Sequence, residues 1–399
     1  MTDELAPPTP PSEPTPGEFP EPLGPPAPPR RSGPARRTLI VFGGYAVAFV
    51  VVAIAQVLGL DPVIRFVLAV VGLAFGAVAV GEATERLAER LSPAATGVVQ
   101  SVLGNLPELF LAIFALQAGL VGVVAAALVG SVLGNALFVL GLALVVGGVR
   151  HGHLAFSGPA NRLFATELLL GVAALTIPFL ATQPGGPDFG HEQELSAIVA
   201  VVLLVVFALS VPVALRMAEA GPGTKLSAAD LESDVPAAIH ALHPLAPTLG
   251  LLSISAASAA FVADWFVNAL NPAMAALGMS EAFAGLIVVA LAGNAVENLA
   301  GITAAAKRRG DLAMSLILNS ALQIVLFLAP VIVLLSFFVA PVPLTLILNP
   351  LLLGSLAVTA ILVFAIVIDG EGNALEGAML LGLYLIVGAA VWWGPAIAP

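Results

Sequence analysis

The chain is dominated by long apolar segments that are separated by short polar connections. After residue 38, eleven segments have the hydrophobicity and the length, about 20 residues, of a helix that crosses a lipid bilayer. These segments cover residues 39–58, 62–81, 95–118, 120–148, 163–182, 195–217, 244–268, 280–306, 311–339, 343–368 and 374–395. The pattern predicts an all-α, polytopic membrane protein with about eleven transmembrane helices.

The composition supports a membrane protein and excludes several other classes. Hydrophobic residues make up 59% of the 399 residues, charged residues only 10%, and the mean hydropathy of +1.05 is too high for a soluble domain. The chain has no cysteine, which excludes disulfides, thiolate metal sites and cysteine nucleophiles. The net charge of -11 lies largely in the amino-terminal segment and the polar connections, and it gives no sign of nucleic-acid binding.

The first 38 residues differ from the rest of the chain. They contain 13 of the 32 prolines, mixed with Ser, Thr and Glu, so we expect a disordered tail. If the amino terminus is cytoplasmic, 13 of the 14 Lys and Arg residues fall on the cytoplasmic side and only Arg65 falls outside. The sequence therefore predicts a multi-pass protein of the cell membrane with a cytoplasmic amino terminus.

An internal repeat becomes visible when the chain is shifted by 189 residues. The segment LGNLPELFLAIFA at 103–115 then lies over AGNAVENLAGITA at 292–304. The shift pairs Gly104 with Gly293, Asn105 with Asn294, and Glu108 with Glu297. Without a gap, it also sets GSVLGNALFVLGLAL at 130–144 over NSALQIVLFLAPVIV at 319–333. An internal duplication is the simplest explanation.

The two repeats are expected to be inverted. In the predicted topology, the helices that carry Glu108 and Glu297 cross the membrane in opposite directions. Inverted repeats with polar interruptions at matching places are typical of secondary transporters whose site lies near the bilayer midplane. The predicted organisation is a tail at 1–38, a first helix at 39–61, a first repeat at 62–217, a cytoplasmic linker at 218–243 and a second repeat at 244–399.

The interruption in the first repeat contains a glycine, Gly104, and a proline, Pro107. Pro107 has no amide hydrogen and its ring collides with the carbonyl of Leu103, so we expect the helix to kink or break there and to free a backbone carbonyl. Gly104 and Gly293 relax the backbone and allow another helix to approach closely.

Glu108 and Glu297 are the strongest candidates for a functional site. A carboxylate at the centre of a span costs roughly 2.5 to 3.5 kcal/mol on insertion scales, and two that face each other also repel. A divalent cation offsets both costs, because Ca2+ prefers about six to eight oxygen ligands. The two carboxylates, the side-chain oxygens of Asn105 and Asn294, freed carbonyls and water are all suitable donors. Protons are the other way to neutralise the pair, so competition for one site would give exchange.

At these residues, the sequence resembles the cation/proton exchangers of the Ca2+/cation antiporter superfamily, the group that contains the calcium/proton antiporters. In that family, a Gly-Asn-Ala-Thr-Glu-Leu motif in the third span and a Gly-Asn-Ala-Ala-Glu-His motif in the eighth carry the cation-binding glutamates. The matching residues here are Gly104, Asn105, Glu108 and Leu109, and Gly293, Asn294, Ala295 and Glu297. The resemblance implies eleven spans, one extra helix before two groups of five.

The same resemblance implies further site residues and the transported ions. The family has polar residues in the spans that follow the motifs, where this chain has Ser131, Asn135, Ser320 and Gln323. We expect these residues to act as ligands or to line the ion pathway, although serines among small residues also serve helix packing. Ca2+ and H+ are the expected transported ions, the bilayer is the expected surrounding, and no cofactor is expected.

Two positions depart from the family pattern. Leu106 and Pro107 stand where the family usually has Ala and Thr, and a proline before the glutamate is similar to the sodium/calcium exchanger branch. Asn298 stands where the family usually has His, which removes a candidate proton-handling group. Because the first motif lacks the extra Ser, Thr and Asp of the sodium branch, the leading hypothesis is an antiporter that exports Ca2+ in exchange for H+ by alternating access about Glu108 and Glu297.

Other functions stay open on the sequence alone. Sodium-coupled exchange, or transport of another divalent cation such as Mn2+, would use the same kind of site. A membrane enzyme is disfavoured, because the chain has no HExxH, GxSxG or P-loop pattern. A passive channel would show ion flux without coupling to a counter-ion.

Some polar residues outside the motifs also need an explanation. A charged run ends the second predicted span and reads either as a solvated, charge-paired helix end or as an entry funnel; it contains Glu82, Glu85, Arg86, Glu89 and Arg90. Asp264 lies inside a predicted span, so an ion pathway and a displaced span boundary compete. Glu167 is expected to interact with the amino end of its helix. His151 and His153 could bind a metal, although two histidines in a short loop usually do not.

Overall fold

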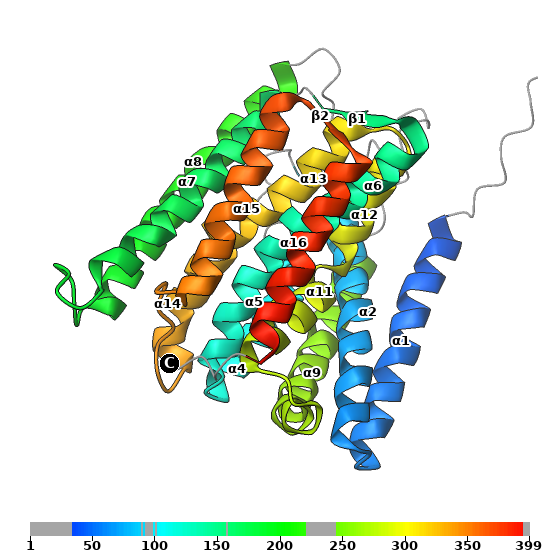
Figure 1. Cartoon of the computed structure of the whole chain (residues 1–399). Coiled ribbons are helices and arrows are strands. Elements are labelled where there is room, and N and C mark those ends of the chain that lie inside the picture. The colour runs from blue at the N-terminus through cyan, green and yellow to red at the C-terminus, as the bar shows by residue number, and fades with distance from the viewer. Residues whose placement is uncertain are drawn as a thin grey trace, which may run out of the picture.

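Long helices form nearly all of the structure (Figure 1). The computed structural model describes residues 34–88, 91, 99, 102–156, 159–220 and 245–393. The first half contains α1 (Pro34–Val57), α2 (Pro62–Ala88), α4 (Leu106–Gln117), α5 (Val121–Leu133), the π-helix η1 (Gly134–Val139), α6 (Leu140–His151), α7 (Pro159–Ala181) and α8 (Glu192–Ala220). The second half contains α9 (Leu245–Leu277), α10 (Glu281–Phe283), the π-helix η3 (Ala284–Val289), α11 (Ala290–Gly293), α12 (Ala295–Ala306), α13 (Gly310–Gln323), the π-helix η4 (Ile324–Leu328), α14 (Ala329–Val339), α15 (Pro350–Asp369) and α16 (Ala374–Trp392).

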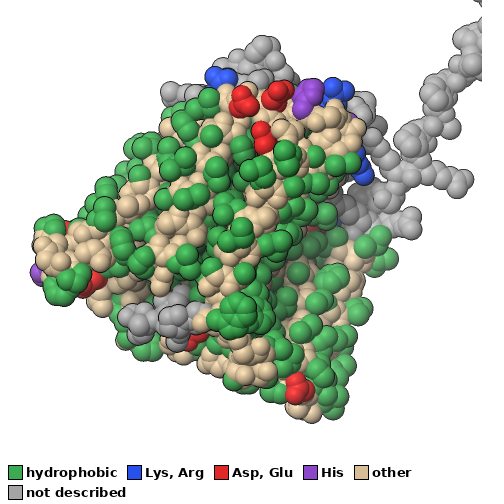
Figure 2. Space-filling model, viewed as in Figure 1, with side chains coloured by type: hydrophobic (Ala, Val, Ile, Leu, Met, Phe, Trp, Pro, Cys, Tyr) green, Lys and Arg blue, Asp and Glu red, His purple; other side chains and the backbone are tan. Residues whose placement is uncertain are grey.

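The predicted all-helical membrane architecture is confirmed. Among the described residues, nine helices are long and apolar enough to cross a bilayer. A tenth span forms if Glu281–Gly293 and Asn298–Ala306, whose axes meet at 63°, are taken together, and α4 is a shorter apolar helix. Part of the predicted span at 95–118 lies outside the described residues, so the eleventh crossing stays a prediction. Hydrophobic side chains cover most of the visible surface, and charged side chains gather at the ends of the helices (Figure 2).

One predicted span begins at the wrong residue. The segment 343–368 was expected to be helical throughout, but α15 begins only at Pro350. Residues 340–349 contain no helix, because Pro341 and Pro343 cannot donate the backbone hydrogen bonds that a helix needs. Leu344, Leu346 and Leu348 in this segment alternate with more exposed residues and are buried, so the segment packs as extended chain against the helices.

The duplication found in the sequence is also present in the backbone. Adding 189 to the bounds of α4 (106–117) gives 295–306, which are the bounds of α12. The same shift moves α5 (121–133) to 310–322, against 310–323 for α13, and η1 (134–139) to 323–328, against 324–328 for η4. Even the π-helical turns, which are rare and occur often at functional sites, are therefore repeated.

The turns that end α4 and α12 are equivalent as well. Gly119 has φ +75° and Arg308 has φ +59°, and 119 plus 189 equals 308. In both turns the following amide reaches back five residues, from Leu120 to the carbonyl of Ala115 and from Arg309 to the corresponding carbonyl of α12. Among the described residues, Arg308 is the one non-glycine residue with positive φ, a conformation that costs an L-residue roughly 1–2 kcal/mol.

Backbone contact between α5 and η3 joins the two repeats. A Cβ atom added to Gly130 would lie 2.2 Å from the carbonyl oxygen of Leu286, and one added to Gly285 would lie 2.4 Å from that of Val123. Glycine is required at both positions because the helices touch backbone to backbone. This close crossing fixes the position of the segment that leads into the second motif.

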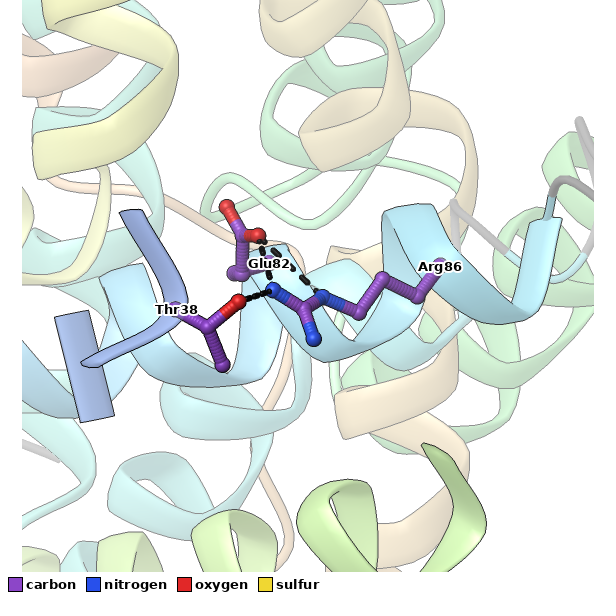
Figure 3. A network of polar contacts seen from close by, with 3 residues as sticks. All are labelled: Thr38, Glu82 and Arg86. Atoms are coloured by element: carbon purple, nitrogen blue, oxygen red, sulfur yellow. Dashed lines mark hydrogen bonds and ion pairs between the residues drawn. The ribbon is translucent and has the colours of Figure 1, made fainter. Parts of the chain in front are cut away.

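A buried ion pair connects the extra helix α1 to α2 (Figure 3). Arg86 donates to Glu82 through Nη2 at 2.7 Å and Nε at 3.2 Å, and both side chains are less than 10% exposed. Arg86 also donates to Thr38 of α1 and lies 5.6 Å from the ring centre of Phe42. The predicted charge pairing is confirmed, but the predicted solvation is wrong for this pair, because α1 packs over it.

Two short strands close one end of the bundle. β1 (His153–Ala155) pairs antiparallel with β2 (Glu371–Asn373), with Leu154 opposite Gly372. The strands connect the first repeat to the second, and we call this end of the bundle the strand end (Figure 1). The turns between α4 and α5 and between α9 and α10 lie at the opposite end.

We predict that Gly130→Ala lowers the free energy of unfolding by about 3 kcal/mol or more, because a Cβ 2.2 Å from a backbone oxygen forces α5 and η3 apart. Gly354→Ala is the matched control, since an added Cβ there meets no atom within 4 Å. Unfolding of both purified variants in the same detergent measures the difference. Equal stability of the two variants would contradict the close helix crossing.

We predict that Arg86→Gln lowers the free energy of unfolding by about 3 kcal/mol, because it removes the ion pair of a buried carboxylate. The double variant Glu82→Gln/Arg86→Gln should lose less, since it also removes the buried negative charge. Unfolding in detergent tests both. A double variant that is less stable than Arg86→Gln would show that charge pairing is not what α1 depends on.

Candidate functional site

Each repeat is interrupted at its motif asparagine. Asn105 has φ -92° and ψ 15°, and Asn294 has φ -88° and ψ 22°, so the two breaks have nearly the same backbone conformation. Each asparagine stands at the position just before α4 or α12 begins. The break lies between Leu103 and Pro107, where the ring of Pro107 was expected to disrupt the helix, and Pro107 is the second residue of α4. The second repeat breaks identically with Val296 at that position, so a proline is not required for the break.

The breaks place both candidate carboxylates in the first turn of a helix. Glu108 is the third residue of α4 and Glu297 is the third residue of α12. Unsatisfied amide groups and the helix dipole make the first turn a favourable place for a negative charge. The motif thus gives each carboxylate a partial positive charge inside an apolar bundle. The side chain of Glu297 lies outside the described part of the structure.

Glu108 packs directly on the motif of the other repeat. A Cβ atom added to Gly293 would lie 2.9 Å from both Cγ and Oε1 of Glu108. The predicted close approach at Gly293 is confirmed, and the group that approaches is the side chain of Glu108. At Gly104, an added Cβ would meet none of the described atoms within 4 Å. Because the side chain of Glu297, the equivalent of Glu108, lies outside the described part, the close approach at Gly104 stays a prediction.

Three side-chain hydrogen bonds join the repeats next to Glu108. The amide of Asn294 donates to Ser131 Oγ at 3.0 Å. The amide of Asn135 donates to Ser320 Oγ at 3.1 Å, and that of Asn105 donates to Gln323 Oε1 at 3.4 Å. Each bond has one residue in each repeat. The structure therefore brings together all six neutral polar residues that the sequence singled out.

Where these hydrogen bonds join the two repeats, the side-chain oxygen of Asn135 can accept a hydrogen bond or bind a cation. Asn135 is 1% exposed, and its Nδ2 donates both to Ser320 and to the carbonyl of Ser131 at 3.0 Å. Because both N–H groups are used, Oδ1 is left as an acceptor, and it has no hydrogen-bond partner among the described residues. A buried amide oxygen without a donor is costly unless it binds a cation or water.

A small pocket begins at Glu108 and runs toward the end opposite the strand end. Its cavity volume of about 30 Å3 has room for about two water molecules. It is lined by Leu73, Pro107, Glu108, Leu111, Ala112, Val124, Ala127, Leu128, Ser131, Val289, Gly293, Leu328 and Ile332. Glu108 and Ser131 are the polar side chains of this lining. The sequence did not single out the apolar wall, because a leucine that lines a pathway looks like any other leucine in an apolar helix.

Asp264 is explained only in part. It lies in the middle of the 33-residue helix α9 and is partly buried. The helix is longer than one span needs, so a displaced span boundary and a role in an ion pathway both stay predictions. His151 contacts the carbonyl oxygen of Ala306 through Nε2 at 3.2 Å. No group of three or more His, Cys, Asp or Glu side chains that could hold a metal occurs among the described residues.

The donors at the junction are hard oxygens and neutral amides. A carboxylate, amide oxygens and hydroxyls suit Ca2+, Mg2+ or Na+ and do not suit soft or redox-active metals. The carboxylate can also take up a proton, whereas the neighbouring hydroxyls and amides cannot lose or gain one near neutral pH. The arrangement therefore allows a cation and a proton to compete for the same carboxylate.

The family follows from matches over both halves. The protein family described as sodium/calcium exchanger protein matches residues 61–216 and 248–393, which include both motifs and leave out the tail and the linker. The chain is a member of that family. The resemblance to the Ca2+/cation antiporter superfamily, cation/proton exchanger branch, is thereby confirmed.

Two curated relatives and one solved structure are similar to this exchanger-family protein over most of its length. It is 34% identical over 325 residues to the Ca(2+)/H(+) antiporter of Aphanothece halophytica, a match that covers 79% of this chain and 87% of the relative. It is 35% identical over 352 residues to the Ca(2+)/H(+) antiporter of Synechocystis sp., covering 86% and 94%. The structure of native YfkE superposes with a TM-score of 0.73 at 27% identity and covers 88% of this chain and 99% of that chain.

We predict that Gly293→Ala lowers the calcium transport rate of this exchanger-family protein at least about tenfold, because its Cβ displaces the carboxylate of Glu108. Gly354→Ala, outside both motifs, should keep the rate within about twofold, since its Cβ meets none of the described atoms within 4 Å. Calcium uptake into proteoliposomes measures both. Equal calcium uptake rates for the two variants would show that the contact of Glu108 with Gly293 is not needed for transport.

Proposed function

We propose that the protein is a secondary active antiporter that exports Ca2+ in exchange for H+. The names of the two relatives, which match most of the chain at 34% and 35% identity, support this substrate pair. The donor set supports it independently, because carboxylate and amide oxygens bind Ca2+ and a carboxylate also binds H+. The observation that carries the proposal is the packing of Glu108 against Gly293 of the opposite motif.

In this proposal, Glu108 and Glu297 are the exchanging groups. They occupy the same position of two equivalent helices, in motifs whose asparagines share one backbone conformation. Two carboxylates in an apolar bundle need positive charge nearby. One Ca2+ supplies it when the site holds metal, and protons supply it when the metal has left. Asn105 and Asn294 are proposed to contribute oxygens, because both lie directly before the carboxylate helices.

Ser131, Asn135, Ser320 and Gln323 are proposed to order this site and to offer additional oxygens. Their cross-repeat hydrogen bonds hold the amides in one orientation. The unpartnered Oδ1 of Asn135 is the best-supported ligand of the four, since a cation would satisfy it. Water completes the coordination shell, because Ca2+ accepts irregular oxygen sets.

Alternating access is the proposed transport mechanism. The pocket beside Glu108 extends along the halves of α4 and α5 next to their connecting turn. Exchange requires a second conformation in which the site opens toward the strand end. Equivalent elements from the two repeats give the chain two pseudo-symmetric ways to pack, which is how inverted-repeat transporters alternate.

The strand end is proposed to be cytoplasmic. Among the described side chains, six of the seven Lys and Arg residues lie near the ends of helices on the strand side, and Arg65 lies in the first turn of α2, next to the α1–α2 turn at the other end (Figure 1). The positive-inside rule then places the amino terminus of α1 in the cytoplasm. The pocket beside Glu108 would accordingly lie on the outward side of that carboxylate.

Two alternatives use the same site and differ in the ions. A sodium/calcium exchanger is favoured by the Leu-Pro-Glu sequence of the first motif, and an exchanger of another divalent cation, such as Mn2+, by the flexibility of the oxygen donor set. Proteoliposomes that contain the purified protein separate them. Calcium uptake driven by a pH gradient in sodium-free medium supports proton coupling, a strict need for sodium overturns it, and uptake without either gradient indicates a channel.

We predict that Glu108→Gln and Glu297→Gln each abolish proton-driven calcium uptake, because an amide can neither carry a proton nor neutralise Ca2+. Both variants should stay folded, as judged by size-exclusion profile and melting temperature. Glu167→Gln is the matched control, since Glu167 is an intramembrane carboxylate of α7, outside this site, and should keep uptake within about twofold. Retained uptake in both motif variants would refute the assigned site.

A further inference from the structure

Five basic residues lie on three separate segments of the chain that pack together at the strand end. His151 Nε2 lies 3.2 Å from the carbonyl oxygen of Ala306, and Asn161 donates to Asp311 Oδ1 at 3.0 Å. A Cβ on Gly310 would lie 2.0 Å from the carbonyl oxygen of a β1 residue, so the chain after α12 packs on the strand. These contacts bring together the basic patch: Arg150, Arg162, Lys307, Arg308 and Arg309.

The basic patch is open to its surroundings. Arg150, Arg162, Lys307 and Arg308 are exposed. Of the acidic residues at the same end, Asp311 accepts a hydrogen bond from the protein and Glu376 closes the capping box that begins α16. Asp369 and Glu371 are exposed and belong to the connection between α15 and α16. Figure 2 shows basic, acidic and histidine side chains gathered at this end, above an apolar surface.

Arg308 stands in a backbone conformation that favours glycine. At the equivalent turn of the first repeat, the chain uses Gly119, which adopts the same positive φ without strain. The second repeat places its glycine two residues later, at Gly310, where close packing on β1 requires one. A glycine in place of Arg308 would relieve the backbone strain, yet the chain has an arginine there. A strained residue retained in this way points to a function of its side chain.

Apolar surface lies directly beside the patch. Val149, which precedes Arg150, is 74% exposed. A ligand that contacts both kinds of surface must carry negative charge and hydrocarbon together. Arginine recognises phosphate oxygens through paired hydrogen bonds, and basic residues at a membrane surface attract anionic headgroups.

We propose that the basic patch binds the phosphate groups of anionic phospholipids in the leaflet at the strand end, with Arg308 as its central contact. The headgroup lies on Lys307, Arg308 and Arg150, and the acyl chains lie along the apolar surface that includes Val149. This interaction is independent of the ions that the protein exchanges. It fixes the turn after α12, the helix that carries the second motif.

The experiment measures lipid binding to the full-length protein in an uncharged detergent. Native mass spectrometry with dioctanoyl phosphatidylglycerol, and separately with dioctanoyl phosphatidylcholine, gives an apparent Kd for each lipid. We expect wild-type protein to prefer phosphatidylglycerol, and Arg308→Gly to lose about fivefold in phosphatidylglycerol affinity without a change for phosphatidylcholine. The preference should also weaken as salt is added.

Melting temperature separates a lipid contact from a structural role. Arg308→Gly relieves backbone strain, so we expect its melting temperature without lipid to equal or exceed that of wild type. Arg65→Gln, which removes the described basic side chain at the opposite end, should keep phosphatidylglycerol affinity within about twofold. A second variant, Lys307→Gln, should weaken phosphatidylglycerol binding without changing the turn.

Three results would overturn the proposal. Arg308→Gly and Lys307→Gln could both keep wild-type phosphatidylglycerol affinity, which would show that the patch does not bind the lipid. Arg308→Gly could lower the melting temperature without lipid, which would show that the side chain stabilises the fold instead. Inorganic phosphate could raise the melting temperature of wild type but not of Arg308→Gly while phosphatidylglycerol fails to bind, which would identify a site for a free anion.

Discussion

The contact of Glu108 with the backbone of Gly293 is the interaction around which the candidate site is organised. It places a carboxylate of one repeat on the motif of the other, inside an apolar bundle. A negative charge there needs compensation, and the protein supplies part of it through the first turn of α4. In the proposed mechanism, a bound cation or a proton supplies further compensation. A site that alternates between these two would have the basic property of an exchanger.

The duplicated backbone explains how such a site is built, and the side chains explain why it is not symmetric. Asn105 and Asn294 adopt the same conformation, but Asn294 bonds to Ser131, whereas Asn105 bonds to Gln323. Exact symmetry would pair Asn105 with Ser320, because Ser320 is the equivalent of Ser131, but the residue that donates to Ser320 is Asn135. A symmetric pair of half-sites would face both sides of the membrane equally. Unequal contacts let one conformation be favoured until an ion or a proton changes the balance.

The surrounding elements hold the site from two directions. Near the site, α5 and η3 touch through the glycines Gly130 and Gly285, so this crossing has little freedom to loosen. Farther away, the strand end joins loops of both repeats, and the ion pair of Glu82 and Arg86 attaches α1. Transport needs movement, and movement is most costly where backbones touch. Helices that meet through side chains are therefore better placed to shift than α5 and η3.

The sequence by itself determined the membrane class, the duplication, the two motifs and the polar residues that meet between them. The membrane class can be read from the sequence because the free energy of transfer into the bilayer is set by the residues of each segment alone. The duplication can be read because the repeated residues keep one constant spacing. Only the tertiary structure showed that both breaks lie at the asparagines, with or without a proline two residues later, and that the side chain of Glu108 packs on Gly293. The identity of the partner of each amide was equally invisible. Those features depend on distances between helices, and packing sets such distances through the combined shape of many side chains.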